Sequence, residues 1–145
     1  MAWGGSALSW TVPCGGMQIF YPVLKYDDAR GAMEFLARAF GFETHASYDG
    51  ENGGVAHAEL RLGDQYVMLG STNEGEERFT HGAGRQSLYV VVDDPDALHD
   101  RAKEAGATIE RELTDHDYGS REFTARDPEG NLWSFGTYRP SAEAA

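Results

Sequence analysis

The chain repeats one pattern of strand, helix and glycine in its two halves, and this repeat constrains the fold more than any other feature. Tyr26-Asp27-Asp28 ends an apolar segment and offers an N-cap carboxylate to a helix, which Gly41 terminates. Val92-Asp93-Asp94 and Gly106 repeat the arrangement in the second half. Segments typical of strands follow each glycine, so the sequence predicts a duplicated βαβββ unit.

Both predicted helices carry an apolar stripe that can pack on a sheet. The first helix is expected over residues 28–40, with Met33, Leu36, Ala37 and Phe40 on one stripe. The second is expected over residues 95–105, with Pro95 at its first position and a buried stripe of Leu98, Ala102 and Ala105. His99 lies on this helix, and we expect it to be exposed.

The strands complete the two units. They are predicted at residues 18–26, 42–48, 55–62, 65–69, 87–92, 107–113, 121–125 and 132–138, with a turn at 126–131 between the last two. The predicted fold class is α+β, in which two βαβββ repeats form curved mixed sheets around a concave cavity. One helix covers the outer face of each sheet, and the cavity is where a ligand would bind.

Composition narrows the classes of partner. The formal net charge of -12 disfavours nucleic acid and anionic membranes, and it suits either a cationic ligand or solubility alone. Cys14 is the only cysteine, so no disulfide forms within the chain, and no segment is apolar enough to span a bilayer. We therefore expect a cytoplasmic protein.

The domain boundaries follow the repeat. We expect a single domain over residues 17–140, made of repeat one at 17–72, a polar linker at 73–85 and repeat two at 86–140. Residues 1–16 form an N-terminal extension, either upstream of the native start or an arm that packs on a partner chain. Residues 141–145 form a C-terminal tail.

The paired units, the Asp-Asp helix starts and the Asp127-Pro128-Glu129-Gly130 turn together resemble the vicinal oxygen chelate superfamily. This superfamily includes glyoxalase I, extradiol dioxygenases and bleomycin-resistance proteins. The resemblance covers residues 18–140 and is nearest to the uncharacterised bleomycin-resistance-like branch, whose chains end much as residues 133–138 do here. It implies a homodimer.

The resemblance also implies where a divalent metal would bind. In metal-using members the ligands come from the first and last strands of each repeat, which correspond here to Tyr21, Leu69, Ser87 and Ser134. None of these is His or Glu, and a shift by one residue supplies neither. We therefore predict no metal and no other cofactor.

The candidate ligand-binding residues lie on the strands and turns around the expected cavity: Tyr21, His57, Glu59, Ser87, Tyr89, His116, Tyr118, Arg121, Glu122 and Ser134. His57 can act as an acid or base near neutral pH, but a strand carrying His57 and Glu59 can equally be a charged outer face. Arg121 and Glu122 can bind a ligand or form a solvated salt bridge. By alternation Trp133 and Phe135 belong to the core.

Three functions remain open, one binding role and two kinds of enzyme. The first is a non-catalytic protein that binds or sequesters a small planar organic molecule, with a cationic one favoured by the acidic charge. The alternative is a metal-independent enzyme of lyase, isomerase or hydrolase type with His57 or Glu59 as general base. A metal-dependent lyase or dioxygenase with displaced ligands is the least favoured. The expected partners are a small-molecule ligand and a second copy of the chain.

Overall fold

The computed structural model describes residues 18–140, so the extension at 1–16 and the tail at 141–145 lie outside the described residues. The elements occur in the order β1 Val23–Tyr26, α1 Ala29–Phe35, the π-helix η1 Leu36–Phe40, β2 Glu43–Asp49, β3 Val55–Leu62, β4 Gln65–Ser71, the 3-10 helix η2 Glu77–Phe79, β5 Ser87–Val91, α2 Pro95–Glu104, β6 Thr108–Asp115, β7 Arg121–Arg126 and β8 Leu132–Gly136.

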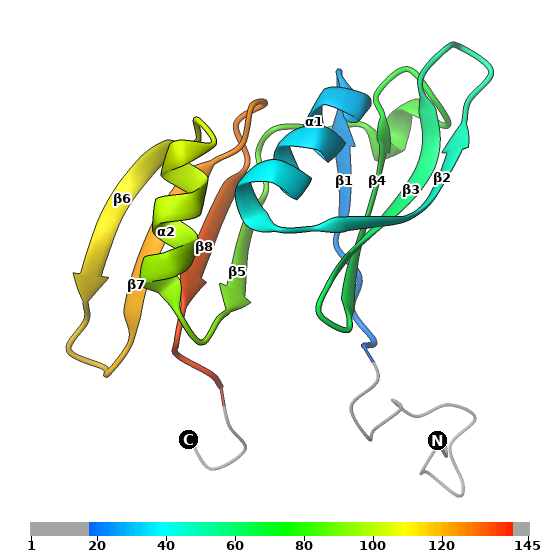
Figure 1. The fold of residues 1–145 in the computed structure, drawn as a ribbon. Coiled ribbons are helices and arrows are strands. Elements are labelled where there is room, and N and C mark those ends of the chain that lie inside the picture. Colours follow the sequence, from blue (N-terminus) through cyan, green and yellow to red (C-terminus); the bar gives the residue numbers. More distant parts are fainter. Residues whose placement is uncertain (1–17, 141–145) are drawn as a thin grey trace, which may run out of the picture.

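The strands form two four-stranded mixed sheets with the same topology (Figure 1). Sheet A has the order β1-β4-β3-β2, and sheet B has the order β5-β8-β7-β6. In each sheet the first strand of the module pairs parallel with the last, and the other pairings are antiparallel. The predicted α+β fold with two repeated modules is confirmed. No helix within residues 18–140 is long and apolar enough to cross a membrane.

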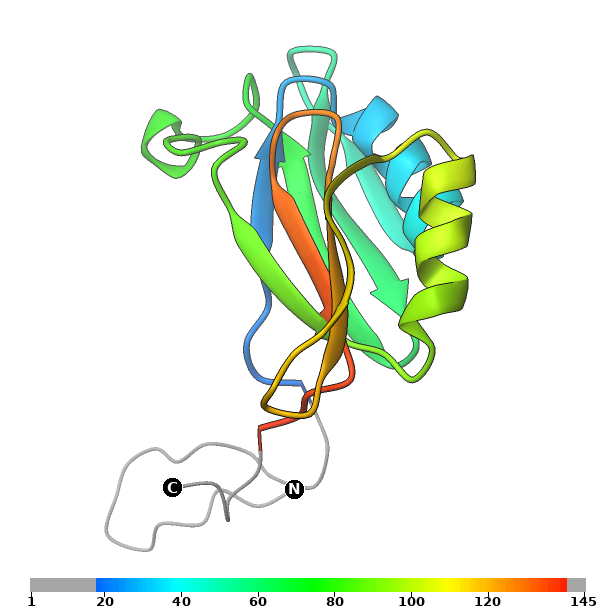
Figure 2. The ribbon, with the colours of Figure 1, turned by 90° about the vertical axis from the view of Figure 1, so that its left-hand side faces the viewer.

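Both helices lie on the same side of the two sheets (Figures 1 and 2). The Asp28 carboxylate accepts a hydrogen bond from the Gly31 amide, and the Asp94 carboxylate accepts one from the Ala97 amide, as the N-cap prediction requires. Gly41 ends the first helical segment with a φ of 86°, a left-handed conformation that favours glycine. These local signals were sufficient to locate both helices.

The first helix differs from the predicted stripe because its last turn is a π-helix. A π turn contains more residues than an α turn and so rotates the residues in it relative to the helix before it. The predicted Leu36 and Phe40 are buried, whereas Met33 and Ala37 are only half-buried. The remaining buried positions on this segment are Ala29, Ala32, Phe35 and Ala39.

Two placements predicted from the sequence are wrong. His99 is buried, because α2 turns it toward sheet B, where its ring meets Phe123 edge-on at 5.3 Å and its Nε2 lies 2.9 Å from Glu112. The first strand begins only at Val23 rather than at residue 18. Pro22 has no amide to donate and instead accepts a bond from the Met68 amide through its carbonyl.

One continuous core joins the two modules. Trp133 and Phe135 of β8 are fully buried, which confirms the prediction from alternation. The Phe40 ring, which comes from the first module, lies 5.5 Å from Trp133 and 4.9 Å from Phe135. Phe42 contacts Trp133 edge-on at 5.6 Å, so the first helix closes over both sheets.

A buried carboxylate connects the modules at the turn between β7 and β8. Asp127 accepts hydrogen bonds from the Tyr26 hydroxyl at 2.7 Å and from Trp133 Nε1 at 3.1 Å. Glu129 reaches the first module as well, since its carboxylate accepts bonds from the amides of Asp27 and Asp28. Charge-assisted bonds of this kind are stronger than neutral ones, so the turn holds the first module in place.

Tyr26→Phe tests this connection. The variant keeps the ring and removes only the hydroxyl that bonds to Asp127, so we expect the free energy of unfolding to fall by about 1.5–3 kcal/mol. Urea denaturation measures the change. Tyr48→Phe is the matched control because Tyr48 is 60% exposed, and equal stability of the two variants would contradict the prediction.

Candidate functional site

Each sheet has one face covered by a helix and one that the described residues leave open. Side chains alternate between the two faces, so Leu24 and Leu69 belong to the buried face of sheet A, while Lys25 and Met68 belong to its open face. In sheet B, Phe135 marks the buried face and Ser134 the open one. We call these two surfaces the open faces, and most of the candidate ligand residues lie on them.

The open face of sheet B brings together side chains from three neighbouring strands, the edge strand β5 and the inner strands β8 and β7. Tyr89 on β5 is opposite Ser134 on β8, which is opposite Thr124 on β7. One pair further along, Glu122 on β7 is opposite Gly136 on β8. Tyr89, Glu122 and Ser134 were predicted as ligand residues, and register places all three on this face.

Glu122 lies flat across the sheet because β8 has a glycine beneath it. A Cβ at position 136 would overlap Glu122 Cγ and would lie 2.8 Å from the Tyr89 hydroxyl, so only glycine leaves room for both side chains. The Glu122 side chain is only 10% exposed. A carboxylate is thus held in a largely buried position on the open face, beside the buried Thr124.

Aromatic side chains surround this carboxylate and form what we call the Glu122 cluster: Tyr89, His116, Tyr118, Glu122 and Tyr138. The Tyr118 hydroxyl donates a bond to Glu122 Oε1 at 3.1 Å, and the rings of Tyr118 and His116 stack at 5.0 Å. Tyr138 meets Tyr118 edge-on at 5.9 Å, and its carbonyl accepts a bond from the Tyr89 hydroxyl at 2.7 Å. His116 Nε2 lies 3.5 Å from Glu122 Oε1 and has no hydrogen-bond partner within residues 18–140.

The carboxylate changes the acidity of its neighbours. Burial raises the pKa of Tyr118 above its ordinary value, and the hydrogen bond to Glu122 and the charge of Glu122 raise it further. Burial likewise raises the pKa of Tyr89, with the Glu122 charge as a smaller contribution. Both hydroxyls therefore remain protonated donors well above neutral pH.

The positions that correspond to metal ligands in the superfamily hold unsuitable donors. Ser134 Oγ is hydrogen-bonded to Thr124 Oγ1 at 2.7 Å, and Ser87 is exposed at the start of β5. Leu69 is not on the open face, because it packs in the core and Met68 takes the open-face position instead. Within residues 18–140 no three His, Cys, Asp or Glu side chains are grouped to hold a metal ion. These residues do not fit a divalent metal site.

The open face of sheet A carries a second, smaller group. His57 Nε2 lies 3.0 Å from Glu59 Oε2, and the Tyr48 ring stacks over His57 at 6.3 Å. Lys25 stands opposite Gly70, with its amine 3.1 Å from where a Cβ would be. The two predicted polar residues of β3 are thus paired with each other. Tyr21 lies just before β1 and is 40% exposed.

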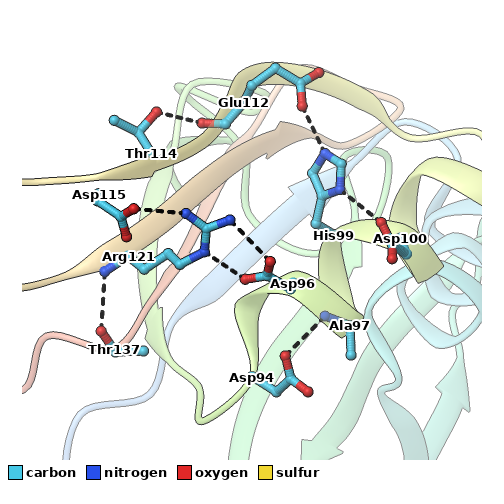
Figure 3. A network of polar contacts seen from close by, with 10 residues as sticks. All are labelled: Asp94, Asp96, Ala97, His99, Asp100, Glu112, Thr114, Asp115, Arg121 and Thr137. Carbon is cyan, nitrogen blue, oxygen red and sulfur yellow. Dashed lines mark hydrogen bonds and ion pairs between the residues drawn. The ribbon is translucent and has the colours of Figure 1, made fainter.

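Arg121 is separated from its neighbour Glu122 because adjacent residues of a strand face opposite ways. Its guanidinium pairs with Asp96 on α2 at 2.7 Å and with Asp115 on β6 at 3.1 Å (Figure 3). The same view shows His99 bridging α2 to Glu112 of β6. Arg121 therefore fastens α2 to sheet B, on the face away from the Glu122 cluster.

A large cleft lies elsewhere. It is a cleft of about 980 Å³ between the modules, and Tyr89 is the only candidate ligand residue that contributes to it. Its other lining residues include Leu62 and Leu88 from helix-covered sheet faces, Leu98 from α2 and Phe42 just before β2. Most of the candidate residues thus lie on or beside the open faces rather than in this cleft, and Arg121 lies on the helix-covered face of sheet B.

Sequence reasoning missed Tyr138 and Gly136. Glycine within an apolar strand pattern indicates a close approach by another group, and Gly136 is such a glycine. Gly70 occupies the same place on the last strand of the first module, opposite Lys25. Tyr138 gave no signal of its own, because it follows the end of β8 and joins the cluster through a turn in the chain.

Comparisons with known proteins agree with this fold. The sequence model of the Glyoxalase/Bleomycin resistance protein/Dioxygenase superfamily matches residues 18–135. An uncharacterized protein of Mycobacterium bovis is 34% identical over 121 residues, which is 79% of this chain and 80% of that protein.

Two solved structures are similar over most of the chain. TioX from Micromonospora sp. ML1 is 32% identical with a TM-score of 0.70, over 83% of this chain and 99% of that one. The bleomycin-binding protein of bleomycin-producing Streptomyces verticillus, solved in complex with copper(II)-bleomycin, is 26% identical with a TM-score of 0.62. That match covers 87% of this chain and 100% of that one.

Glu122→Gln tests the electrostatics of the cluster. Removing the negative charge stabilises the tyrosinate form, so we expect the pKa of Tyr118 to fall toward its ordinary value. The fall should be partial, because burial is the larger cause of the shift and remains. Titration of ¹³C-labelled tyrosine by NMR measures it in both proteins. An unchanged Tyr118 pKa would mean that Glu122 does not interact with this hydroxyl in solution.

Proposed function

Because the chain belongs to the glyoxalase/bleomycin resistance protein/dioxygenase superfamily, we propose that it binds and sequesters a small planar organic molecule on the open faces of its sheets. The observation that carries this proposal is the Glu122 cluster, where tyrosine rings and hydroxyls collect on the face that the helices leave free. A tyrosine offers a large flat surface and a hydrogen-bonding tip, which suits a planar ligand with polar substituents.

Two further facts favour binding over catalysis. The donor atoms at the superfamily's metal positions do not fit a divalent metal, so the chemistry of the metal-using members has no support here. The similar protein of Streptomyces verticillus is described as bleomycin-binding, which is a binding role. The net charge of -12 adds a long-range attraction for cationic ligands, and this part should weaken with salt.

A second copy of the chain would complete the site. The open faces expose apolar side chains that a monomer has no reason to leave in water, including Val23 at 59% and the adjoining Phe20 at 84%. A homodimer in which open faces cover one another would bury them and enclose a ligand between sheets. The polar linker at 73–85 is long enough for modules to be exchanged between chains.

A metal-independent enzyme of lyase, isomerase or hydrolase type is the second candidate, and one contact favours it. The 3.0 Å approach of His57 to Glu59 resembles a base held by a carboxylate, which is the arrangement a general base needs. Both side chains are partly exposed, however. In the binding proposal this pair supplies polar contacts to the ligand.

The ligand proposal is tested by a thermal-shift screen of planar aromatic compounds, followed by calorimetry on a compound that raises the melting temperature. Tyr89→Ala and Tyr21→Ala each remove a ring and should each weaken binding by about 1–3 kcal/mol, roughly five- to 150-fold. Tyr89→Phe keeps the ring and serves as the control. Unchanged affinity in both alanine variants, with the fold intact, would place the site elsewhere.

The assembly proposal predicts a sedimenting species of twice 15.9 kDa at micromolar concentration. Val23→Asp places a charge on the face that a second copy would cover, so this variant should shift toward the monomer. Lys103→Asp is the control, because Lys103 is exposed on α2 away from both open faces. A wild-type protein that sediments only as a monomer would end the idea.

A further inference from the structure

Glu122 is a largely buried carboxylate with few hydrogen-bond donors around it. Its side chain is nine-tenths buried, yet the Tyr118 hydroxyl is the only side chain within residues 18–140 that donates a hydrogen bond to it. His116 Nε2 is 3.5 Å away, too far for a good hydrogen bond, and is itself buried without a hydrogen-bond partner among residues 18–140. A buried carboxylate is costly unless a cation or several donors compensate it.

Within residues 18–140 no arginine or lysine forms an ion pair with Glu122. Arg111 on β6 is opposite Thr124 on the same face, and its charge slightly lowers the pKa of Tyr118 without pairing with Glu122. Arg121 is adjacent in sequence but belongs to the other face, where Asp96 and Asp115 occupy its guanidinium. The carboxylate is therefore available to a cation that arrives from outside.

The groups around Glu122 also suit a cation rather than another polar group. Tyr89, Tyr118 and Tyr138 contribute three aromatic rings, and the face of an aromatic ring attracts positive charge. The hydroxyls of Tyr89 and Tyr118 are already engaged with the Tyr138 carbonyl and Glu122, which fixes the ring positions before a ligand binds. One face of the Tyr118 ring is stacked on His116, so a cation would meet its other face and the neighbouring rings. Aromatic rings beside a carboxylate are a combination that attracts N-alkylated nitrogen cations.

We propose that the Glu122 cluster is a subsite for a quaternary or aromatic nitrogen cation, with Glu122 as its counter-ion and Tyr89, Tyr118 and Tyr138 around it. This inference rests on the proposed function, and it names the chemical class of the ligand at that site. The planar part of the ligand then extends along β8 over Ser134, whose hydroxyl is bonded to Thr124. Gly136 is essential to the subsite because any side chain there would displace Glu122.

The experiment compares two probes of nearly equal shape, N-methylquinolinium, which is a permanent cation, and quinoline, which is neutral at pH 7.5. Calorimetry should show that the wild-type protein binds the cation at least about tenfold more tightly than quinoline. Glu122→Gln keeps the shape and the acceptor for Tyr118 but removes the charge. It should abolish most of that preference by weakening the binding of the cation.

Glu104→Gln is the matched control, since it removes the same charge from an exposed position on α2 and should keep the preference. If Glu122→Gln does not fold, Tyr138→Ala replaces it, because Tyr138 is 41% exposed and its loss should weaken the cation more than quinoline. Equal binding of the two probes, or a preference that survives Glu122→Gln, would overturn the subsite and leave the proposed function standing. Failure of the wild-type protein to bind either probe at millimolar concentration would count against both the subsite and the proposed function.

Discussion

The structure depends on one buried carboxylate, Asp127. It accepts bonds from Trp133 Nε1 and from the Asn131 side chain within its own hairpin, and from the Tyr26 hydroxyl of the first module. Because this turn is tied to both modules, β8 is fixed relative to β1, and the Phe40 ring can close against Trp133. Two sheets that share no backbone hydrogen bonds thereby become one core. The first helix and the last hairpin are each incomplete without the other.

Features with local causes were predictable from the sequence. Capping carboxylates at Asp28 and Asp94 and the glycines after each helix follow from backbone hydrogen bonding and dihedral preferences alone, so they could be read directly. The burial of Trp133 and Phe135 followed from alternation in a strand. The errors have tertiary causes. His99 is buried because it contacts Glu112 and Phe123 on sheet B, and no local sequence pattern indicates those partners.

The sequence predicts the candidate site only where the alternation of side chains along a strand determines which face a residue occupies. Tyr89 and Ser134 could be assigned to one face, but Arg121 and Glu122 were grouped although adjacent residues of a strand diverge. In the structure, Arg121 and Glu122 lie on opposite faces of sheet B. Arg121 holds α2 through Asp96, whereas Glu122 lies among tyrosines on the open face. The choice of face depends on the register between β7 and β8, and Tyr138 enters only through the path of the chain after β8.

The two modules share a backbone arrangement but differ in the side chains on their open faces. Each module places a glycine on the open face of its last strand, Gly70 in sheet A and Gly136 in sheet B, and each glycine leaves room for a charged side chain to lie across the sheet. That side chain is Lys25 in the first module and Glu122 in the second. The two glycine positions thus share their shape, but the side chains that lie over them carry opposite charges. Duplication accounts for the geometry of the site, while the choice of ligand must come from these substituted charges.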